Sequence, residues 1–442
     1  MLSYSPTHLA TGVLSAANRT VPVAARVEPY TLVHVVVGET TKDLIIPQVV
    51  GHMIAQAETP GADCPARVLV LFLEPARVAL RRAVRRRVRE LRRAAPSLTL
   101  RLVPFVSRLG LTKNAGIVRR FLGLSRNASL VFHCRGETAA QWAAAIAKHM
   151  PNAGIVVDIR GAWPEELIFA RGYHEIEGAD PETRADHDAA VAVLHEAFAR
   201  AGAVLSVSPG MIDWLDAMGV EESKRFYIPC CVSRLTYTSV DRAAVRTSLG
   251  IADKHVFAYA GTITKYQHVE DGVVPFVRAL TRLSSTTHFL CLTNDVGGMR
   301  AALARGGVGE TRATVICAPQ SEVARYLSAA DAGLLLRAPS RLNRLSQPTK
   351  LGEYLGAGVP VVVARGTGVV GEIVSDADAG IVVDIFGRDE SGIAAEARRA
   401  LDVIVLNGAR MRDHALRLCD EHFTWRHYVA RARSAYRMSL DA

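Results

Sequence analysis

Short runs of apolar, mostly β-branched residues recur along the whole chain without regular polar alternation, and segments with helical periodicity separate them. Strands of this kind are buried on both faces, which is typical of parallel sheets covered by helices. We therefore predict an α/β fold with parallel sheets. The expected strands are residues 31–37, 68–73, 98–103, 130–134, 154–159 and 203–208, followed by 256–260, 288–293, 313–317, 332–336, 360–364 and 380–384.

The strand pattern stops and restarts near residues 229–240, which show neither period clearly. A chain of 442 residues is also too long for one ordinary core. We predict two doubly wound, Rossmann-like domains, over residues 1–232 and 233–422. Residues 423–442 are expected to add one amphipathic helix.

The formal charge of +10 indicates an anionic partner, which is a nucleic acid, an anionic lipid or a phosphorylated ligand. The seven cysteines are scattered and never in C-x-x-C spacing, which favours reduced thiols and argues against a structural zinc site. No window approaches 18 uninterrupted apolar residues, and the first 20 residues lack a secretion signal. We expect a cytoplasmic protein.

Ligands of doubly wound sheets bind beyond the carboxyl ends of the strands, so the loops there are the candidate sites. Gly261, Thr262 and Lys265 follow one expected strand directly. Their backbone N–H groups and the ammonium are suited to phosphate oxygens. Gly and Thr are also common in ordinary turns, so the same residues are compatible with a purely structural loop.

Two further loops offer polar groups. Pro319 lies in the loop after residues 313–317, where the backbone is placed to meet a nucleotide base. Arg337 follows residues 332–336 and either reaches a phosphate or pairs with an acidic side chain.

The stretch SQPTKLGEYLGAGVPVVVA, residues 346–364, is interpreted as a short helix, a glycine stop and a strand. Ser346 is the expected N-cap and Pro348 the first helical residue. Gly358 stands where a left-handed residue must end the helix.

Lys350 and Glu353 are three residues apart and therefore share one face of this helix. One interpretation is a surface ion pair worth about 0.5 kcal/mol. The other starts from the helix dipole, because a cation in the first turn does not stabilise a helix but does favour an anionic ligand there. Glu353 would then accept hydrogen bonds from a pair of sugar hydroxyls. This second interpretation describes a nucleotide diphosphate with its ribose.

The same stretch, with GEIV and AGIVVD after it, resembles the donor-site signature of family 4 glycosyltransferases of the GT-B fold. FAYAGTITKYQ, YIPCCVS and SAADAGLLLR are similar to other segments of that family. VFHCRGETAAQWAAAIAK and IVVDIRGAWPEEL resemble segments of a subset of its members. The resemblance extends over residues 30–440.

The resemblance implies two domains that face each other across a cleft, with the acceptor bound by the N-terminal one and the nucleotide sugar by the C-terminal one. It implies that the last helix returns to the N-terminal domain. It also implies that Lys265 and Lys350 hold the donor diphosphate and that Glu353 binds the ribose. Gly261, Thr262, Pro319 and Arg337 complete the expected donor site.

Residues of the N-terminal domain have two interpretations each. The resemblance places His133 opposite the donor sugar as a catalytic residue, whereas a strand-end histidine with satisfied hydrogen bonds is the structural alternative. Arg160 and Glu165 either line the acceptor side or, for Arg160, fix a loop by pairing with an aspartate. Gly38 is a further acceptor-side candidate.

The chain departs at two places from the pattern of the family that it resembles. Many members carry a second glutamate eight residues before the one that matches Glu353, and Leu345 stands there with Ser346 beside it. The first strand is followed by Gly38 alone, where some relatives have two glycines.

Breaking a sugar–phosphate bond builds negative charge on the leaving diphosphate, and fixed cations stabilise that charge. We find no paired carboxylates of the glycosidase type, and we expect transfer without a metal ion or another cofactor, with the nucleotide sugar as co-substrate. The resemblance implies retention of anomeric configuration.

Residues 75–96 carry nine arginines and only one acidic residue. Leu80, Val84, Val88 and Leu91 are spaced as an apolar stripe, so we predict one amphipathic helix. Its basic face, Arg77–Arg93, is either simply solvated or attracted to an anionic membrane surface, at about 1 kcal/mol per basic residue. Binding to nucleic acid is a third interpretation.

Three functions are compatible with these features. The first is a glycosyltransferase that acts on a glycan or a lipid-linked acceptor in envelope or polysaccharide synthesis, either free in the cytoplasm or peripheral on the inner membrane face. The second is a glycosyltransferase that modifies DNA or tRNA. The third is a catalytically silent scaffold of the same fold, against which Lys350 and Glu353 argue.

Overall fold

The computed structural model describes residues 28–123, 125–148, 150–233 and 241–442. They form two compact units. The N-terminal unit holds residues 28–168, Ile176–Cys231 and Trp425–Ala442. The C-terminal unit holds Phe169–Glu175 and Val232–Thr424. The first 20 residues and part of the predicted boundary near 229–240 lie outside the described residues.

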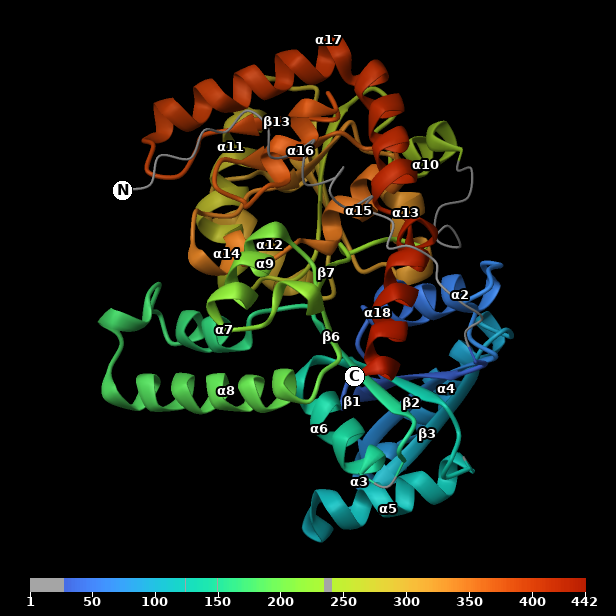
Figure 1. The fold of residues 1–442 in the computed structure, drawn as a ribbon. Coiled ribbons are helices and arrows are strands. Elements are labelled where there is room, and N and C mark those ends of the chain that lie inside the picture. The colour runs from blue at the N-terminus through green and yellow to red at the C-terminus, as the bar shows by residue number, and fades with distance from the viewer. Residues whose placement is uncertain (1–27, 124, 149, 234–240) are drawn as a thin grey trace. The chain divides into compact units, whose positions relative to one another are not determined.

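The N-terminal unit is built on a seven-stranded sheet of order β3-β2-β1-β4-β5-β6-β7, in which neighbouring strands are parallel (Figure 1). The sequence predicted six of these strands, and the short β7 was not predicted. The strands are β1 (Thr31–Val37), β2 (Arg67–Pro75), β3 (Thr99–Phe105), β4 (Leu130–Arg135), β5 (Ala153–Ile159), β6 (Ala203–Ser206) and β7 (Arg225–Tyr227).

Helices connect these strands, and α18 packs against β4, β5 and β6 after a short 3-10 turn at Trp425–Tyr428. The predicted helix over 423–440 therefore begins later than expected, at Val429. The α-helices are α2 (Gly51–Glu58), α3 (Ala76–Ala79), α4 (Arg82–Ala94), α5 (Gly110–Leu122), α6 (Gly136–Ala147), α7 (Trp163–Ala170), α8 (Pro181–Ala199), α9 (Pro209–Ala217) and α18 (Val429–Asp441).

The arginine-rich segment differs from the single helix that we predicted. Arg81 is extended, with φ −62° and ψ 136°, and separates α3 from α4. As a result Leu80 leaves the apolar stripe and is 61% exposed, while Val84, Val88 and Leu91 are buried as predicted.

The C-terminal unit contains a six-stranded sheet of order β10-β9-β8-β11-β12-β13, also with parallel neighbours. All six strands were predicted. They are β8 (His255–Ala260), β9 (Thr287–Leu292), β10 (Ala313–Ile316), β11 (Ala332–Leu335), β12 (Val361–Ala364) and β13 (Gly380–Val383).

Both faces of this sheet are buried, which explains why its strands are apolar without alternation. Phe257 and Tyr259 belong to one core cluster, and the intervening Ala258 belongs to the other. The same holds for Val362 and its neighbour Val361.

Helices cover the two faces, and the 33-residue α17 packs against α11 and α15 (Figure 1). The helices of this unit are α10 (Arg242–Ser248), α11 (Val274–Leu283), α12 (Val296–Arg305), α13 (Gln320–Ser328), α14 (Arg341–Leu345), α15 (Thr349–Gly356), α16 (Val370–Asp376) and α17 (Glu390–His422).

The helix of the signature stretch begins one residue later than predicted. Pro348 is its N-cap residue, in an extended conformation, and Thr349 is the first helical residue. Ser346 instead follows the preceding helix α14. Gly358 has φ 64°, so the predicted left-handed stop before β12 is confirmed.

Candidate nucleotide site in the C-terminal unit

The candidate residues of the C-terminal unit follow the carboxyl ends of β8, β10 and β11. Because the strands are parallel, these ends lie along one edge of the sheet. Gly261 and Thr262 come directly after β8, and Arg337 follows β11 by two residues. Helix α15 starts from the same edge, since it leads from β11 to β12.

Gly261 allows the loop after β8 to lie against the side chain of Lys350. Its φ is 147°, and a Cβ atom added there would stand only 2.6 Å from Lys350 Nζ. The loop is fixed by Tyr259, whose hydroxyl donates to the Thr262 carbonyl at 2.8 Å. Thr262 and Lys265 are exposed, so both are open to a ligand.

Lys350 is a buried cation in the first turn of α15. Its side chain is only 7% exposed, and Nζ donates to Gln267 Oε1 at 2.8 Å. The ammonium also lies 5.2 Å from the ring centroid of Tyr259. Burial and, after it, the Arg337 guanidinium lower the pKa of Lys350 to about 7, although Glu353 opposes both. The surrounding side chains therefore hold this lysine at the edge of deprotonation near neutral pH.

Arg337 is the second buried cation, and it shares an acceptor with the first. Its Nη2 donates to Gln267 Oε1 at 3.2 Å, and its Nη1 donates to Ser346 Oγ at 3.3 Å. The guanidinium lies 5.3 Å from the ring centroid of Tyr266. One neutral amide oxygen thus accepts hydrogen bonds from both Lys350 and Arg337.

The amino end of α15 adds partial positive charge to this group. Pro348 provides no side-chain hydrogen bond to the N–H groups of the first turn. These N–H groups carry the positive end of the helix dipole, and Lys350 stands among them. A helix start with two buried cations is suited to an anion such as a phosphate.

Glu353 lies one turn further along α15 and is partly exposed. Its Oε1 accepts from Gln320 Nε2 at 3.4 Å, and burial raises its pKa although Lys350 and Gln320 oppose the shift. Lys350 and Glu353 each bond to a different glutamine, so the surface ion pair considered from the sequence is not the arrangement found. Pro319 is exposed and is the N-cap residue of α13, directly before Gln320.

Gln267 and Gln320 were not predicted as site residues. Both lie in or next to loops, and neither a periodicity nor a charge pattern singles out a lone glutamine. Leu345, where many family members have glutamate, is buried at the end of α14. The adjacent Ser346 contacts the site through Arg337.

The candidate residues of the N-terminal unit are placed differently. His133 is completely buried, with Nδ1 2.9 Å from the Tyr436 hydroxyl and Nε2 3.1 Å from Asp158 Oδ2. Its ring stacks on that of His34, with centroids 4.3 Å apart. This is the arrangement that the structural alternative describes, a strand histidine with both nitrogens hydrogen-bonded.

Arg160 matches its structural alternative in the same way. Its Nε donates to Asp158 Oδ2 at 2.8 Å, and its guanidinium lies 5.3 Å from the ring centroid of Trp425. Glu165 is buried in the first turn of α7. Gly38 has φ 71° and donates its N–H to the Leu73 carbonyl at 2.9 Å.

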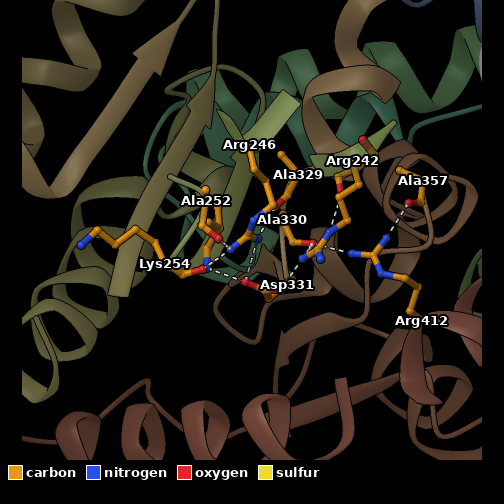
Figure 2. Close-up of polar contacts among 11 residues, drawn as sticks. Arg242, Arg246, Ala252, Lys254, Ala329, Ala330, Asp331, Ala357 and Arg412 are labelled. Carbon is orange, nitrogen blue, oxygen red and sulfur yellow. Dashed lines mark hydrogen bonds and ion pairs between the residues drawn. The ribbon is translucent and has the colours of Figure 1, made fainter. Parts of the chain in front are cut away.

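Arginines cluster around Asp331 (Figure 2). Asp331 directly precedes β11, whereas Arg337 follows the other end of that strand. Asp331 is paired with Arg242 and Arg246, and its Oδ2 accepts the Val256 N–H at 2.8 Å. Arg412 donates to the carbonyls of Ala330 at 2.7 Å and Ala357 at 3.3 Å. These bonds satisfy carbonyls at the ends of α13 and α15, so the cluster holds the fold rather than the candidate site.

No group of three or more His, Cys, Asp or Glu side chains in the described part of the chain is arranged to hold a metal ion. Two Asp-x-Asp triplets occur in the sequence, at Asp186–Asp188 in α8 and Asp376–Asp378 at the end of α16. Asp378 pairs with Arg410 and with His414. Within the described ranges, no helix combines the length and the apolar character that crossing a membrane requires.

Residues 254–402 match the family model described as Glycosyl transferases group 1. No curated protein matches the chain significantly. Among solved structures, Anabaena HepE in complex with UDP has a TM-score of 0.63 and 15% identity, over 92% of this chain and 99% of that chain. Sucrose-phosphate synthase from Thermosynechococcus elongatus has a TM-score of 0.64 and 15% identity, over 92% and 98%.

WaaG, a glycosyltransferase involved in lipopolysaccharide biosynthesis, has a TM-score of 0.56 and 13% identity, over 92% of this chain and 99% of that chain. At such identities the likeness concerns the fold alone. The predicted fold class, two Rossmann-like α/β domains of GT-B type, is confirmed.

Proposed function

We propose, from the match of residues 254–402 to the glycosyl transferases group 1 family, that the chain transfers a sugar from a nucleotide diphosphate donor to an acceptor. Membership of family 4 within this group stays a prediction. The observation that carries the proposal is the pair of buried cations, Lys350 and Arg337, at the uncapped start of α15. A donor diphosphate supplies the negative charge that complements this group.

We assign the remaining site residues to other parts of the same donor molecule. Glu353, one helical turn beyond Lys350, accepts hydrogen bonds from the ribose hydroxyls. Lys265 and the Gly261–Thr262 backbone approach the phosphates from the loop after β8. The loop that carries Pro319 offers backbone groups to the base. Exposure of Thr262 and Lys265 supports these roles, because neither side chain has to move out of a core.

The chemistry follows from where charge develops. As the bond between sugar and diphosphate breaks, negative charge grows on the leaving phosphate oxygens. Lys350, Arg337 and the helix start are already fixed at that place, so they stabilise the leaving group without reorganising. We propose that this replaces a metal ion, and that the anomeric configuration is retained, as the family resemblance implies.

For the acceptor, we propose a glycan or a lipid-linked sugar in envelope or polysaccharide synthesis. The fold shared with WaaG, which is involved in lipopolysaccharide biosynthesis, supports this choice over DNA or tRNA. A catalytically silent scaffold is disfavoured because burial lowers the pKa of Lys350, which costs folding free energy that a ligand-free scaffold does not recover.

The test is turnover of a panel of nucleotide sugars by the wild-type protein, measured as release of nucleoside diphosphate with and without candidate acceptors. UDP-glucose comes first, because HepE has been solved with UDP and with UDP-glucose. A thermal-shift screen with UDP, GDP, ADP and dTDP identifies the nucleotide. Release from at least one donor is expected, and the absence of both binding and release for all of them would favour the scaffold.

We further propose that the basic helix α4 attaches the protein to an anionic membrane surface. Eight of the nine arginines of residues 77–93 are exposed, while the apolar side of α4 packs on the core. Vesicles with about 30% anionic lipid should pellet the protein, and neutral vesicles should not. Changing Arg85, Arg86 and Arg87 to Glu should abolish pelleting, and equal pelleting of this variant would contradict the proposal.

A further inference from the structure

Gln267 occupies the centre of the cationic group in the C-terminal unit. It is 6% exposed, and its Oε1 accepts from Lys350 Nζ at 2.8 Å and from Arg337 Nη2 at 3.2 Å. Its own backbone is fixed, because its N–H donates to the Thr264 carbonyl at 2.9 Å. One oxygen atom, on a short 3-10 turn that follows β8, therefore contacts both cations.

The acceptor is neutral although both donors are charged. Hydrogen bonds between charged partners are roughly twice as strong as those with a neutral partner. An amide oxygen therefore accepts from Lys350 and Arg337 without bringing a negative charge of its own. A charged oxygen from a ligand would make the stronger bonds at the same position.

We propose that Gln267 is a positioning residue whose amide oxygen takes the place of a donor phosphate oxygen until the donor binds. It keeps the two cations pointing at one spot, so that the diphosphate meets a formed site. On binding, a phosphate oxygen replaces Oε1 between Lys350 and Arg337, and the glutamine side chain turns away. This inference rests on the proposed function and deepens it.

The neutrality of Gln267 is then the property on which binding depends. A carboxylate at the same position would form charge-assisted bonds with both cations and would compete with the phosphate. Gln267→Glu should therefore stabilise the ligand-free protein and weaken ligand binding at the same time. A change that only loosened the fold would lower the thermal midpoint and the affinity together.

The experiment uses the full chain and inorganic pyrophosphate, which probes the diphosphate position independently of base and sugar. Calorimetric titration at pH 8 should give an affinity at least 10-fold weaker for Gln267→Glu than for wild type. The thermal midpoint of the ligand-free variant should be higher. Gln141→Glu, the same change on α6 of the N-terminal unit, should bind pyrophosphate as wild type does.

Titration in two buffers of different ionisation enthalpy adds a second readout. Wild type should take up a proton on binding, because the phosphate recharges Lys350. Gln267→Glu should not, because its carboxylate keeps that lysine protonated. Equal affinity and equal proton uptake in both proteins would overturn the inference, and so would the absence of pyrophosphate binding to wild type.

A crystal structure of wild type with UDP tests the proposal without a variant. It should show a phosphate oxygen within hydrogen-bond distance of Lys350 Nζ, and Oε1 of Gln267 moved away from that position. An unmoved Gln267 would overturn the inference. If wild type turns over a nucleotide sugar while Gln267→Glu binds equally well, this inference fails alone. If pyrophosphate binds as described but no nucleotide sugar is turned over, the proposed function fails alone.

Discussion

Replacing Lys350 by Met should stabilise the ligand-free protein while abolishing diphosphate binding. The folded state lowers the pKa of this lysine from 10.5 to about 7, so folding at pH 7 works against its protonation. By linkage, that shift costs the wild type about 4 kcal/mol at pH 7. Losing the bond to Gln267 costs the variant about 1 kcal/mol, and Arg337 still donates to the same oxygen. The expected net gain is about 3 kcal/mol.

The gain must shrink as the pH rises. The unfolded chain keeps the proton on Lys350 up to about pH 10.5, and the folded chain releases it near pH 7. Between these values the unfolded state binds more protons, so wild-type stability increases with pH. The cost falls to about 2 kcal/mol at pH 9, and the net advantage of the Lys350→Met variant over wild type falls to about 1 kcal/mol.

Urea unfolding followed by far-UV circular dichroism at pH 7 and pH 9 measures both values. All four tryptophans, Trp142, Trp163, Trp214 and Trp425, lie in the N-terminal unit, so tryptophan fluorescence follows that unit separately. An unfolding transition that appears in circular dichroism but not in tryptophan fluorescence belongs to the C-terminal unit. That transition is the one that should shift. A variant that is less stable than wild type at both pH values, or an advantage that grows with pH, would refute the reasoning.

The remaining predictions concern residues that affect the folding stability of each unit. Asp331→Ala should lower the free energy of unfolding by about 3 kcal/mol, because it leaves the buried Arg246 without its carboxylate. Urea unfolding measures this loss, and a loss below about 1 kcal/mol would contradict the prediction. Burial and the nearby ring of His133 lower the pKa of His52, so the unfolded chain binds more protons below about pH 6.5 and stability falls with acid. His52→Phe keeps an aromatic ring stacked on Trp425. It should reduce the dependence of the free energy of unfolding on pH by up to about 1.4 kcal/mol per pH unit, measured by urea unfolding followed by tryptophan fluorescence. An unchanged pH dependence would contradict the lowered pKa of His52.

Hydrophobic patterning predicted the sheets because the strands are buried on both faces. Twelve expected runs correspond to strands, including Val361–Ala364 and its left-handed stop at Gly358. The three-residue β7 was missed because Arg225–Tyr227 contains too few residues for a pattern. The break at Arg81 was missed because arginine is a good helix former, and only the local backbone conformation separates α3 from α4.

The site was predictable only in part. Lys350, Glu353 and Gly261 were conspicuous because charges and a glycine interrupt apolar segments. Gln267 was not, because its role depends on two cations that are 70 and 83 residues away in sequence. For His133, sequence left two interpretations, and only packing shows its bonds to Tyr436 and to Asp158.

The central claim is that the edge of the C-terminal sheet binds a nucleotide sugar through α15. The most direct measurement compares nucleoside diphosphate release by wild type, Glu353→Ala and Glu322→Ala on the preferred donor. Glu322 is a matched control on α13, because its exposed carboxylate accepts from Arg325 Nη1 at 2.8 Å. Glu353→Ala should keep the wild-type circular dichroism spectrum and lose release by at least about 100-fold, a loss of about 2.7 kcal/mol in transition-state stabilisation, while Glu322→Ala stays active. Wild-type release by the Glu353→Ala variant would contradict the account.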